Sequence, residues 1–198
     1  MGTAIHRADR PIRSLEAFFG SKYPPQGRKN LWCRVPHSRY TLTMIRVAEE
    51  ADAADMAALS SNFRDLLESY SPVFWRKKEG IIPTHTTYMK GLINNPNQIT
   101  LVYEQDGKIE GFITGLITQA PPVYDPGGPV CLVDDFVVRD ARDWSTVGKE
   151  LIQTCENSAR FRNAVVVIVV SPIKCMEQRE MLRDHGVEPV SEWRIKIL

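Results

Sequence analysis

Residues 131–152 combine an apolar, β-branched run, a short polar loop and an amphipathic helix. The apolar residues of the helix recur with a 3.6-residue period and therefore fall on one face: Val147, Leu151, Ile152, Cys155 and Ala159. Ser145 and Thr146 are of the types that cap helix N-termini, and Gly148 lets another group approach the first turn closely. Free amide N–H groups at a helix start, together with the helix dipole, bind phosphate oxygens. This stretch therefore predicts a strand that leads into an anion-binding helix start.

The remainder of residues 44–198 is predicted to contain further strands and helices. Strands are predicted at residues 43–48, 100–104, 109–117, 131–138, 164–170 and 189–198. Helices are predicted to begin at Ala51, Ser60, Thr84, Ser145 and Lys174. The continuous apolar run 164–170 is typical of a strand that is buried on both faces. Asp106 and Gly107 form a turn signal between two strands, which predicts a hairpin.

The strand, loop and helix of residues 131–152 resemble motif A of the GNAT N-acetyltransferase superfamily. In that motif the fourth strand ends in Val, and an Arg/Gln-x-x-Gly-x-Gly/Ala loop then binds the pyrophosphate of coenzyme A. Counting from Val138, the last glycine of the pattern falls on Gly148. Asp143 stands at the Arg/Gln position, and Thr146 stands at the first glycine. The order of the predicted elements from Met44 onward is also similar to the order in the family.

The resemblance implies an α+β fold, the GNAT acyl-CoA N-acyltransferase fold, with a mixed, mostly antiparallel central sheet flanked by helices. It also implies an acetyl-CoA-dependent N-acetyltransferase that acts on the amine of a small molecule. Two other interpretations stay open. One is a non-catalytic acyl-CoA-binding or regulatory module of the same fold, and the other is a protein N-acetyltransferase. The aromatic loop at 71–80 and the Pro- and Gly-rich loop at 120–129 favour a closed pocket over the open groove that a protein acceptor needs.

Acetyl-CoA is the cosubstrate that the resemblance implies. Backbone amides at Phe136 and Val138 would bind the pantetheine arm and the thioester carbonyl, and the loop would bind the pyrophosphate. The implied cofactor-binding residues are Phe136, Val137, Val138, Arg142, Asp143, Trp144, Ser145, Thr146, Val147, Gly148 and Lys149. Asp143 would repel a phosphate, so its side chain is expected to turn away or to cap the helix. Arg142 or Lys149 would then supply the positive charge.

Asp134 and Asp135 are the candidate catalytic residues, because an ammonium must lose a proton before its nitrogen can attack a thioester. Strand alternation predicts that they lie on opposite faces, so that at most one faces the cleft. Asp134 is favoured as the base because it shares parity with Phe136 and Val138. Both carboxylates could instead be structural, with one of them paired to a cation such as Arg162.

The family's general acid, a Tyr in the last helix, corresponds to Leu182 here, and a usual Asn corresponds to Cys175. In the family, the helix starts and loops around the acceptor cleft supply substrate contacts. The residues implied for that role are Trp75, His85, Tyr88 and Tyr124. His85 is the most useful chemically, because an imidazole titrates near neutral pH.

Composition narrows the choice of partners and compartment. The 198 residues carry a net charge of +1, which does not indicate a nucleic-acid or membrane surface, and residues 164–170 are too few to span a bilayer. Neither a Cys-x-x-Cys pair nor zinc-spaced His residues occur among the four cysteines, Cys33, Cys131, Cys155 and Cys175. We therefore expect reduced cysteines, no metal site and a cytoplasmic protein. A homodimer stays open.

Residues 1–43 differ in composition from the rest of the chain. They are rich in Lys, Arg, Pro and Gly and show no sustained periodicity, which is typical of a segment that does not fold alone. The interpretations are a disordered basic extension, an organelle-targeting segment, or an over-extended start with Met44 as the first residue of the protein. We favour the last, with a single GNAT domain at residues 44–198.

Overall fold

The computed structural model describes residues 43–198, and the expectations for residues 1–42 lie outside the described residues. The strands are β1 (Thr43–Val47), β2 (Gln98–Gln105), β3 (Lys108–Thr118), β4 (Val130–Val138) and β5 (Val166–Val169). The α-helices are α1 (Ala53–Tyr70), α2 (Ile81–Ile93), α3 (Val147–Phe161) and α4 (Met176–Asp184). Two 3-10 turns, η1 (Glu50–Asp52) and η2 (Ala141–Ser145), precede α1 and α3.

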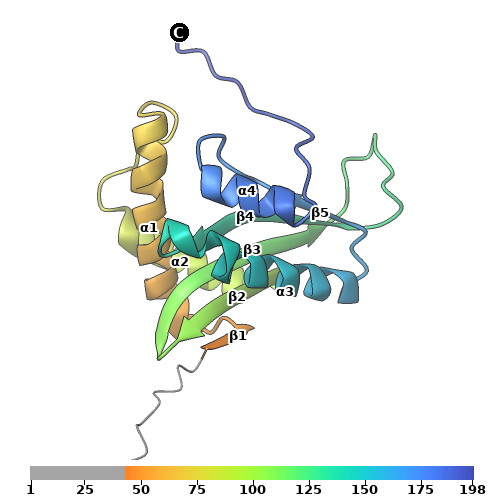
Figure 1. Ribbon diagram of the computed structural model, residues 1–198, viewed down its shortest axis with the longest axis horizontal. Helices are drawn as coiled ribbons and strands as arrows, with labels where there is room; N and C mark the ends of the chain where they lie inside the picture. The colour runs from red at the N-terminus through yellow and green to blue at the C-terminus, as the bar shows by residue number, and fades with distance from the viewer. Residues whose placement is uncertain (1–42) are drawn as a thin grey trace, which may run out of the picture. The chain divides into compact units, whose positions relative to one another are not determined.

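The strands form one sheet in the order β1-β2-β3-β4-β5 (Figure 1). The first three pairs are antiparallel, and β4 and β5 are parallel. The predicted mixed, mostly antiparallel sheet is therefore confirmed. The predicted hairpin is also present, because Asp106 and Gly107 between β2 and β3 both have positive φ, as a tight two-residue turn requires.

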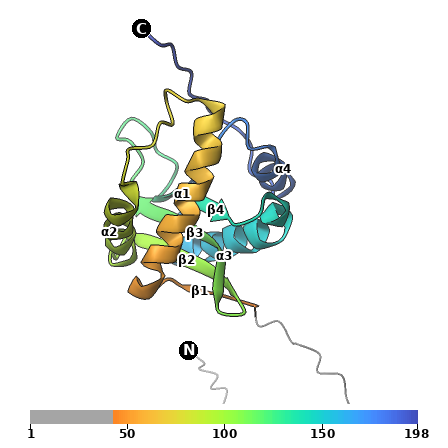
Figure 2. The ribbon, with the colours of Figure 1, turned by 90° about the vertical axis from the view of Figure 1, so that its left-hand side faces the viewer.

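The helices cover the sheet on two sides (Figure 2). Alternate residues of the central strands divide the core accordingly. Phe112 and Val137 belong to a cluster with residues of α1 and α2, whereas Ile113 and Phe136 belong to a cluster with residues of α3 and α4. The α3 face contains the five apolar positions predicted from the 3.6-residue period, all of them buried. The side of the sheet that a β4 residue faces therefore decides which pair of helices it meets.

One continuous helix, α1, occupies the place of the two helices predicted between Ala51 and Pro72. Ser60 is buried inside it and does not cap a new helix, because its hydroxyl lies 3.3 Å from Nε of Arg64 and 3.5 Å from Oδ1 of Asp135. Helix α2 begins at Ile81, ahead of the predicted Thr84, directly after Gly80 at φ 64°. Tertiary contacts thus replaced a predicted break with a longer helix.

Two predictions for the C-terminal part are wrong. Strand β5 is at the edge of the sheet, and Val166 and Ile168 are 39% and 41% exposed, so the run is not buried on both faces. Residues 187–198 form no strand. In this segment the ring of Trp193 lies 6.3 Å from the ring of Phe74, which belongs to the α1–α2 loop.

Cys131, Cys155 and Cys175 are free and buried, whereas Cys33 lies outside the described residues. The Cys131 and Cys155 sulfurs both lie beside Gly115, where a Cβ atom would come within 2.7 Å and 3.2 Å of them. This glycine therefore makes room for two sulfurs between β4 and α3. Within residues 43–198, no helix has the length and apolar character needed to cross a bilayer.

Candidate active site

A bulge in β4 positions the two adjacent carboxylates. The β3–β4 register passes from Ile113 opposite Phe136 to Gly115 opposite Val133, so that two residues of β4 stand against one of β3. The extra residue interrupts the alternation of side chains. Val133 and Phe136 consequently both face the α3–α4 cluster. The alternation assumed for an unbroken strand therefore does not hold between Asp134 and Asp135.

Asp135 faces α1. Its Oδ1 accepts a hydrogen bond from Nη2 of Arg64 at 3.1 Å, and Ser60 Oγ lies 3.5 Å from the same oxygen. The residue is 9% exposed. Burial raises the pKa of the Asp135 carboxyl above its ordinary value, although the Arg64 charge opposes this shift. Asp135 is thus a buried carboxylate held by a guanidinium, and Arg162, the cation expected to pair with one of the two carboxylates, instead donates to the carbonyls of Pro96 and Gln98.

Asp134 is exposed, and no hydrogen bond or ion pair to it is found among the described residues. The charges of both carboxylates affect the pKa of Tyr88 on α2. Burial raises the pKa of its phenol first, and the charges of Asp135 and Asp134 raise it further. Because Val133 and Phe136 both face the α3–α4 cluster, the bulge places both carboxylates on the α1–α2 side, contrary to the expectation that the sheet separates them. Asp134 was favoured because it was expected to share a face with Phe136, and the bulge removes that argument. The side chain of Asp134 is nevertheless exposed, so its oxygens are accessible.

His85 is buried one turn before Tyr88 and stacks on its ring, with the centroids 5.9 Å apart and the planes at 22°. Neither ring nitrogen has a hydrogen-bond partner within residues 43–198. Burial lowers the pKa of the imidazole below its ordinary value, and the Arg64 charge adds to the shift. The ring is consequently neutral at pH 7, and its unpaired nitrogens cost stability.

His85→Phe is expected to raise the melting temperature at pH 8, because an unpaired buried polar group costs about 1–3 kcal/mol and a phenyl ring avoids this cost. Each kcal/mol corresponds to roughly 2–4 °C for a domain of this size. Since the pKa of His85 is lower in the folded than in the unfolded chain, the unfolded chain binds more protons below the ordinary pKa. Wild-type stability should therefore fall between about pH 7 and pH 5, and this contribution should vanish in the variant. Calorimetric melts of the wild type and the variant at pH 8, 7 and 5 measure both effects. A variant that is less stable at pH 8 would contradict it.

Strands β4 and β5 separate after a short parallel ladder. Their last register pair is Val133 with Val169, followed by a hydrogen bond from Val170 N to Val133 O. Residues 134–138 of β4 continue without a β5 partner. The predicted thioester-binding residues, Phe136, Val137 and Val138, all lie in this unpaired part, and their side chains are buried. The fork leaves main-chain groups of β4 available to an extended ligand.

The predicted pyrophosphate loop is divided between core and surface. Trp144, Val147 and Gly148 are buried, and a Cβ at Gly148 would lie 2.7 Å from the Trp144 ring. Trp144 in turn packs edge-on against Phe136 at 4.9 Å. Ser145, Thr146 and Lys149 are exposed at the start of α3. Gly148 therefore accommodates an indole ring, and the exposed residues remain as the candidates for contact with phosphate.

Three side-chain contacts bear on the expectations for this loop. Asp140 caps the 3-10 turn η2 by accepting from Arg142 N at 3.0 Å. Arg142 pairs with Asp140 at 2.6 Å, which leaves Lys149 as the cation without such a pair among these loop residues. Thr146 is at the N-cap position of α3 but makes no side-chain cap, because its hydroxyl donates to the Asp143 carbonyl at 3.3 Å.

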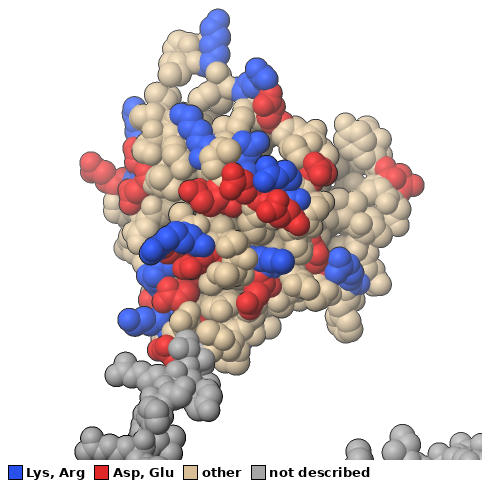
Figure 3. Space-filling view, viewed as in Figure 1, with Lys and Arg blue, Asp and Glu red and all other residues tan. Residues whose placement is uncertain are grey.

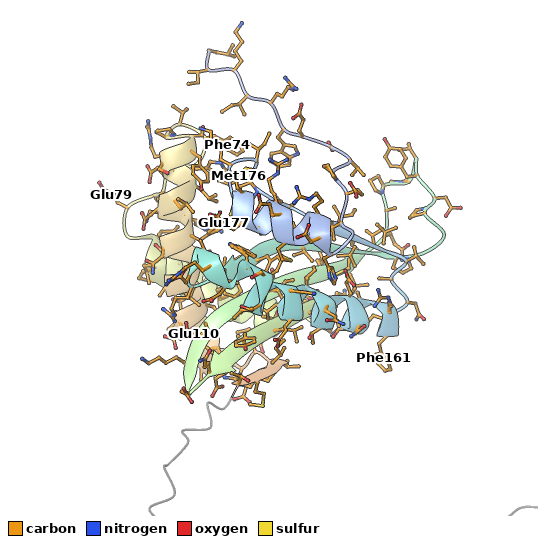
Figure 4. The ribbon with its side chains drawn as sticks, in the orientation of Figure 1. Phe74, Glu79, Glu110, Phe161, Met176 and Glu177 are labelled. Atoms are coloured by element: carbon orange, nitrogen blue, oxygen red, sulfur yellow. The ribbon has the colours of Figure 1, made fainter. Side chains whose placement is uncertain are left out.

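In α4, Leu182 and Cys175 are both buried, at 5% and 2% exposure. Burial raises the pKa of the Cys175 thiol above its ordinary value, so the thiol keeps its proton at neutral pH. Figure 4 labels Met176 and Glu177 at the start of this helix, near Phe74. Lys174, just before α4, contacts Tyr70 at the end of α1. Its Nζ donates to the Tyr70 carbonyl at 3.2 Å and lies 5.9 Å from the centroid of the Tyr70 ring.

The four predicted substrate residues are not all brought together. His85 and Tyr88 stack, whereas Trp75 contacts Phe74 in an aromatic cluster that extends to Trp193. Tyr124 is 71% exposed on the 120–129 loop. A cavity of about 370 Å³ lies between α1 and the loop before α2, and neither catalytic candidate lines it. Its lining residues are Ser61, Glu68, Lys77, Lys78, Glu79, Gly80, Ile81 and Ile82.

Ser60 and Arg64 are the site residues that the sequence did not identify. They are four residues apart on α1, a spacing that places both on one helix face, but nothing local showed that this face meets Asp135. No group of side chains suited to a metal ion occurs within residues 43–198. Charged residues of both signs are interspersed on the face shown in Figure 3.

No protein-family model matches the chain, and no curated protein matches it significantly in sequence. Solved structures do match it. A predicted acetyltransferase from Clostridium acetobutylicum, solved with acetyl-CoA, aligns with a TM-score of 0.62 at 15% identity, covering 79% of this chain and 96% of that one. The ribosomal-protein-alanine N-acetyltransferase of Brucella melitensis biovar Abortus 2308 aligns with a TM-score of 0.57 at 18% identity, covering 79% and 99%.

An aminoglycoside 6'-N-acetyltransferase from Acinetobacter baumannii aligns with a TM-score of 0.57 at 17% identity, covering 78% of this chain and 99% of that one. These acetyltransferases differ in the acceptors that their names state, so the likeness does not carry an acceptor across. What they share with this chain is the overall fold. The chain therefore has the α+β fold of the GNAT acetyltransferase superfamily.

Proposed function

We propose that the protein is an acetyl-CoA-dependent N-acetyltransferase whose acceptor is the amine of a small molecule. The observation that carries the proposal is the accessible carboxylate of Asp134 at the point where β4 and β5 separate. The fork leaves residues 134–138 free to bind a pantetheine arm through the backbone, and Asp134 lies at the start of that free segment. The likeness to a structure solved with acetyl-CoA supports the choice of ligand.

In this proposal Asp134 removes a proton from the bound ammonium, which frees the nitrogen lone pair. The nitrogen forms a bond with the acetyl carbonyl carbon, and the carbon–sulfur bond then breaks. The nitrogen, positively charged after the attack, releases its second proton to solvent. The thiolate takes up a proton from solvent, because Leu182, at the position of the family's Tyr, has no acidic proton. Asp135 forms an ion pair with Arg64, and its negative charge helps to raise the pKa of the Tyr88 phenol.

The features expected for acetyl-CoA binding are present at the fork but only partly present in the phosphate-binding loop, and the experiment is chosen accordingly. The fork is present, but Arg142 is already paired and Gly148 contacts Trp144, so phosphate binding depends on the α3 start with Ser145, Thr146 and Lys149. Gly148→Glu would displace the Trp144 ring and so test packing as well as binding. A surface charge is the cleaner change.

Lys149→Glu is expected to weaken acetyl-CoA binding roughly tenfold, because reversing an exposed charge near a phosphate changes the binding free energy by about 1 kcal/mol or slightly more. Calorimetric titration of the full chain measures this. Lys108→Glu, the same change at the exposed β2–β3 turn, is the matched control and should leave the affinity unchanged. Absence of wild-type binding at millimolar acetyl-CoA would reject the proposed function.

The buried Leu182 favours one other function, an acyl-CoA-binding module without turnover. The same titration followed by an assay for free CoA thiol separates the two. Saturable binding without thiol release over a broad panel of amines would support the module. Thiol release that depends on an added amine supports the enzyme.

A further inference from the structure

An uncovered apolar surface lies next to Asp134 on the sheet. In the β4–β5 ladder, Cys131 and Val133 face the α3–α4 cluster, so the alternate residues of both strands face the other side. Leu132 is paired with Ile168, and Val166 and Val170 flank Ile168 on the same side. We call Leu132, Val166, Ile168 and Val170 the apolar strip.

The strip is open because α1 and α2 do not reach it. The hydrophobic cluster that α1 and α2 form with the sheet contains Ala48, just after β1, and residues of β2, β3 and the end of β4. It contains no residue of β5. Val166, Ile168 and Val170 accordingly remain 39–41% exposed. By alternation, Asp134 follows Leu132 on the same side of β4 before the bulge. An apolar surface thus ends at a carboxylate.

The charges at that end suit one positive group. Asp134 and Asp135 contribute two negative charges, and the Arg64 guanidinium, 3.1 Å from Asp135, compensates one of them. His85 is neutral at pH 7 because burial lowers its pKa. One uncompensated carboxylate remains for a ligand cation, and no second one remains for a further ligand cation. The half-exposed Tyr88 ring offers a further face for an ammonium.

From this arrangement we infer that the acceptor is a monoamine with an apolar body, and that Ile168 helps to select it. The ammonium lies at Asp134, and the apolar part lies along the strip. This inference rests on the proposed function and narrows it to one substrate class. It disfavours polycationic acceptors such as polyamines or aminoglycosides, which would place additional ammonium groups on an apolar surface without a carboxylate.

The probes are 2-phenylethylamine, a monoamine with an aromatic body, and spermidine, a linear polycation. With acetyl-CoA present, CoA thiol release should be at least about tenfold more efficient for 2-phenylethylamine. Ile168→Asn should raise its KM about tenfold, the scale expected from losing the burial of an aliphatic side chain, without changing the KM for acetyl-CoA. Phe161→Asn, on an exposed aromatic residue at the end of α3 (Figure 4), is the control and should change neither KM.

Equilibrium dialysis of 2-phenylethylamine without acetyl-CoA separates this inference from the proposed function. Binding that is lost in Ile168→Asn supports the strip even if no acetyl transfer occurs. Equal or more efficient turnover of spermidine overturns the inference and leaves the acetyltransferase standing. An unchanged KM in Ile168→Asn, or no binding of the monoamine to a chain that binds acetyl-CoA, also overturns it. If Ile168→Asn does not fold, Ile168→Ala is measured, with the same direction expected.

Discussion

Asp134→Asn is expected to lower turnover by roughly 10²–10⁴-fold while leaving the affinity for acetyl-CoA nearly unchanged, the range that is typical for loss of a general base. Asp134 is accessible at the fork, and the amide cannot take a proton from the ammonium. The loss should shrink at high pH, where the acceptor amine is already neutral. Thiol release as a function of pH and calorimetric binding of acetyl-CoA together measure both parts of the expectation.

The neighbouring Asp135 is not a suitable control position, because it forms an ion pair with Arg64. Asp135→Asn would disturb the contact with Arg64 and is expected to act mainly on stability. Asp55→Asn, on an exposed residue of α1, removes the same charge away from the fork and should leave turnover unchanged. Normal turnover of Asp134→Asn would refute the base assignment while leaving the enzyme proposal intact.

Arg64→Met is expected to destabilise the fold by about 2 kcal/mol, which corresponds to roughly 4–8 °C in melting temperature. The variant leaves the Asp135 carboxylate buried without its cation. We place the effect below that of a fully buried pair because the Arg64 side chain is 35% exposed and solvent screens part of its charge. Thermal unfolding of the full chain measures the change.

The pH dependence identifies the cause. Burial already raises the pKa of Asp135 in the folded chain, and loss of Arg64 raises it further. A group with a raised folded pKa contributes stability at low pH and loses it as the pH rises through the folded pKa. The deficit of Arg64→Met should therefore grow with pH. The double variant Arg64→Met with Asp135→Asn should recover much of the stability at pH 7. A deficit that is independent of pH and is not recovered would indicate lost packing of the Arg64 stem instead.

Local patterns in the sequence were enough to predict most of the elements and the class of fold. The 3.6-residue period from Val147 to Ala159 predicted the buried face of α3, and the Asp106-Gly107 pair predicted the hairpin. These patterns are reliable because a helix face and a tight turn are determined by neighbours in sequence. The strand and the helix on either side of the motif A loop were predicted and are present as β4 and α3. Catalytic, cofactor and acceptor roles remain proposals.

Tertiary contacts decided what local patterns could not. The β4 bulge arises from pairing with β3, and it places Asp134 and Asp135 on the same side of the sheet, although strand alternation predicted opposite faces. Packing of α1 against β4 kept Ser60 inside one helix and gave Asp135 its partner Arg64. The apolar run of β5 was predicted to be a central strand, yet no strand of residues 43–198 pairs with its outer edge, and residues 187–198 form no strand. Sequence therefore determined which segments are strands and helices. Long-range pairing determined their neighbours, and so which side chains meet, because those contacts join residues far apart in the chain.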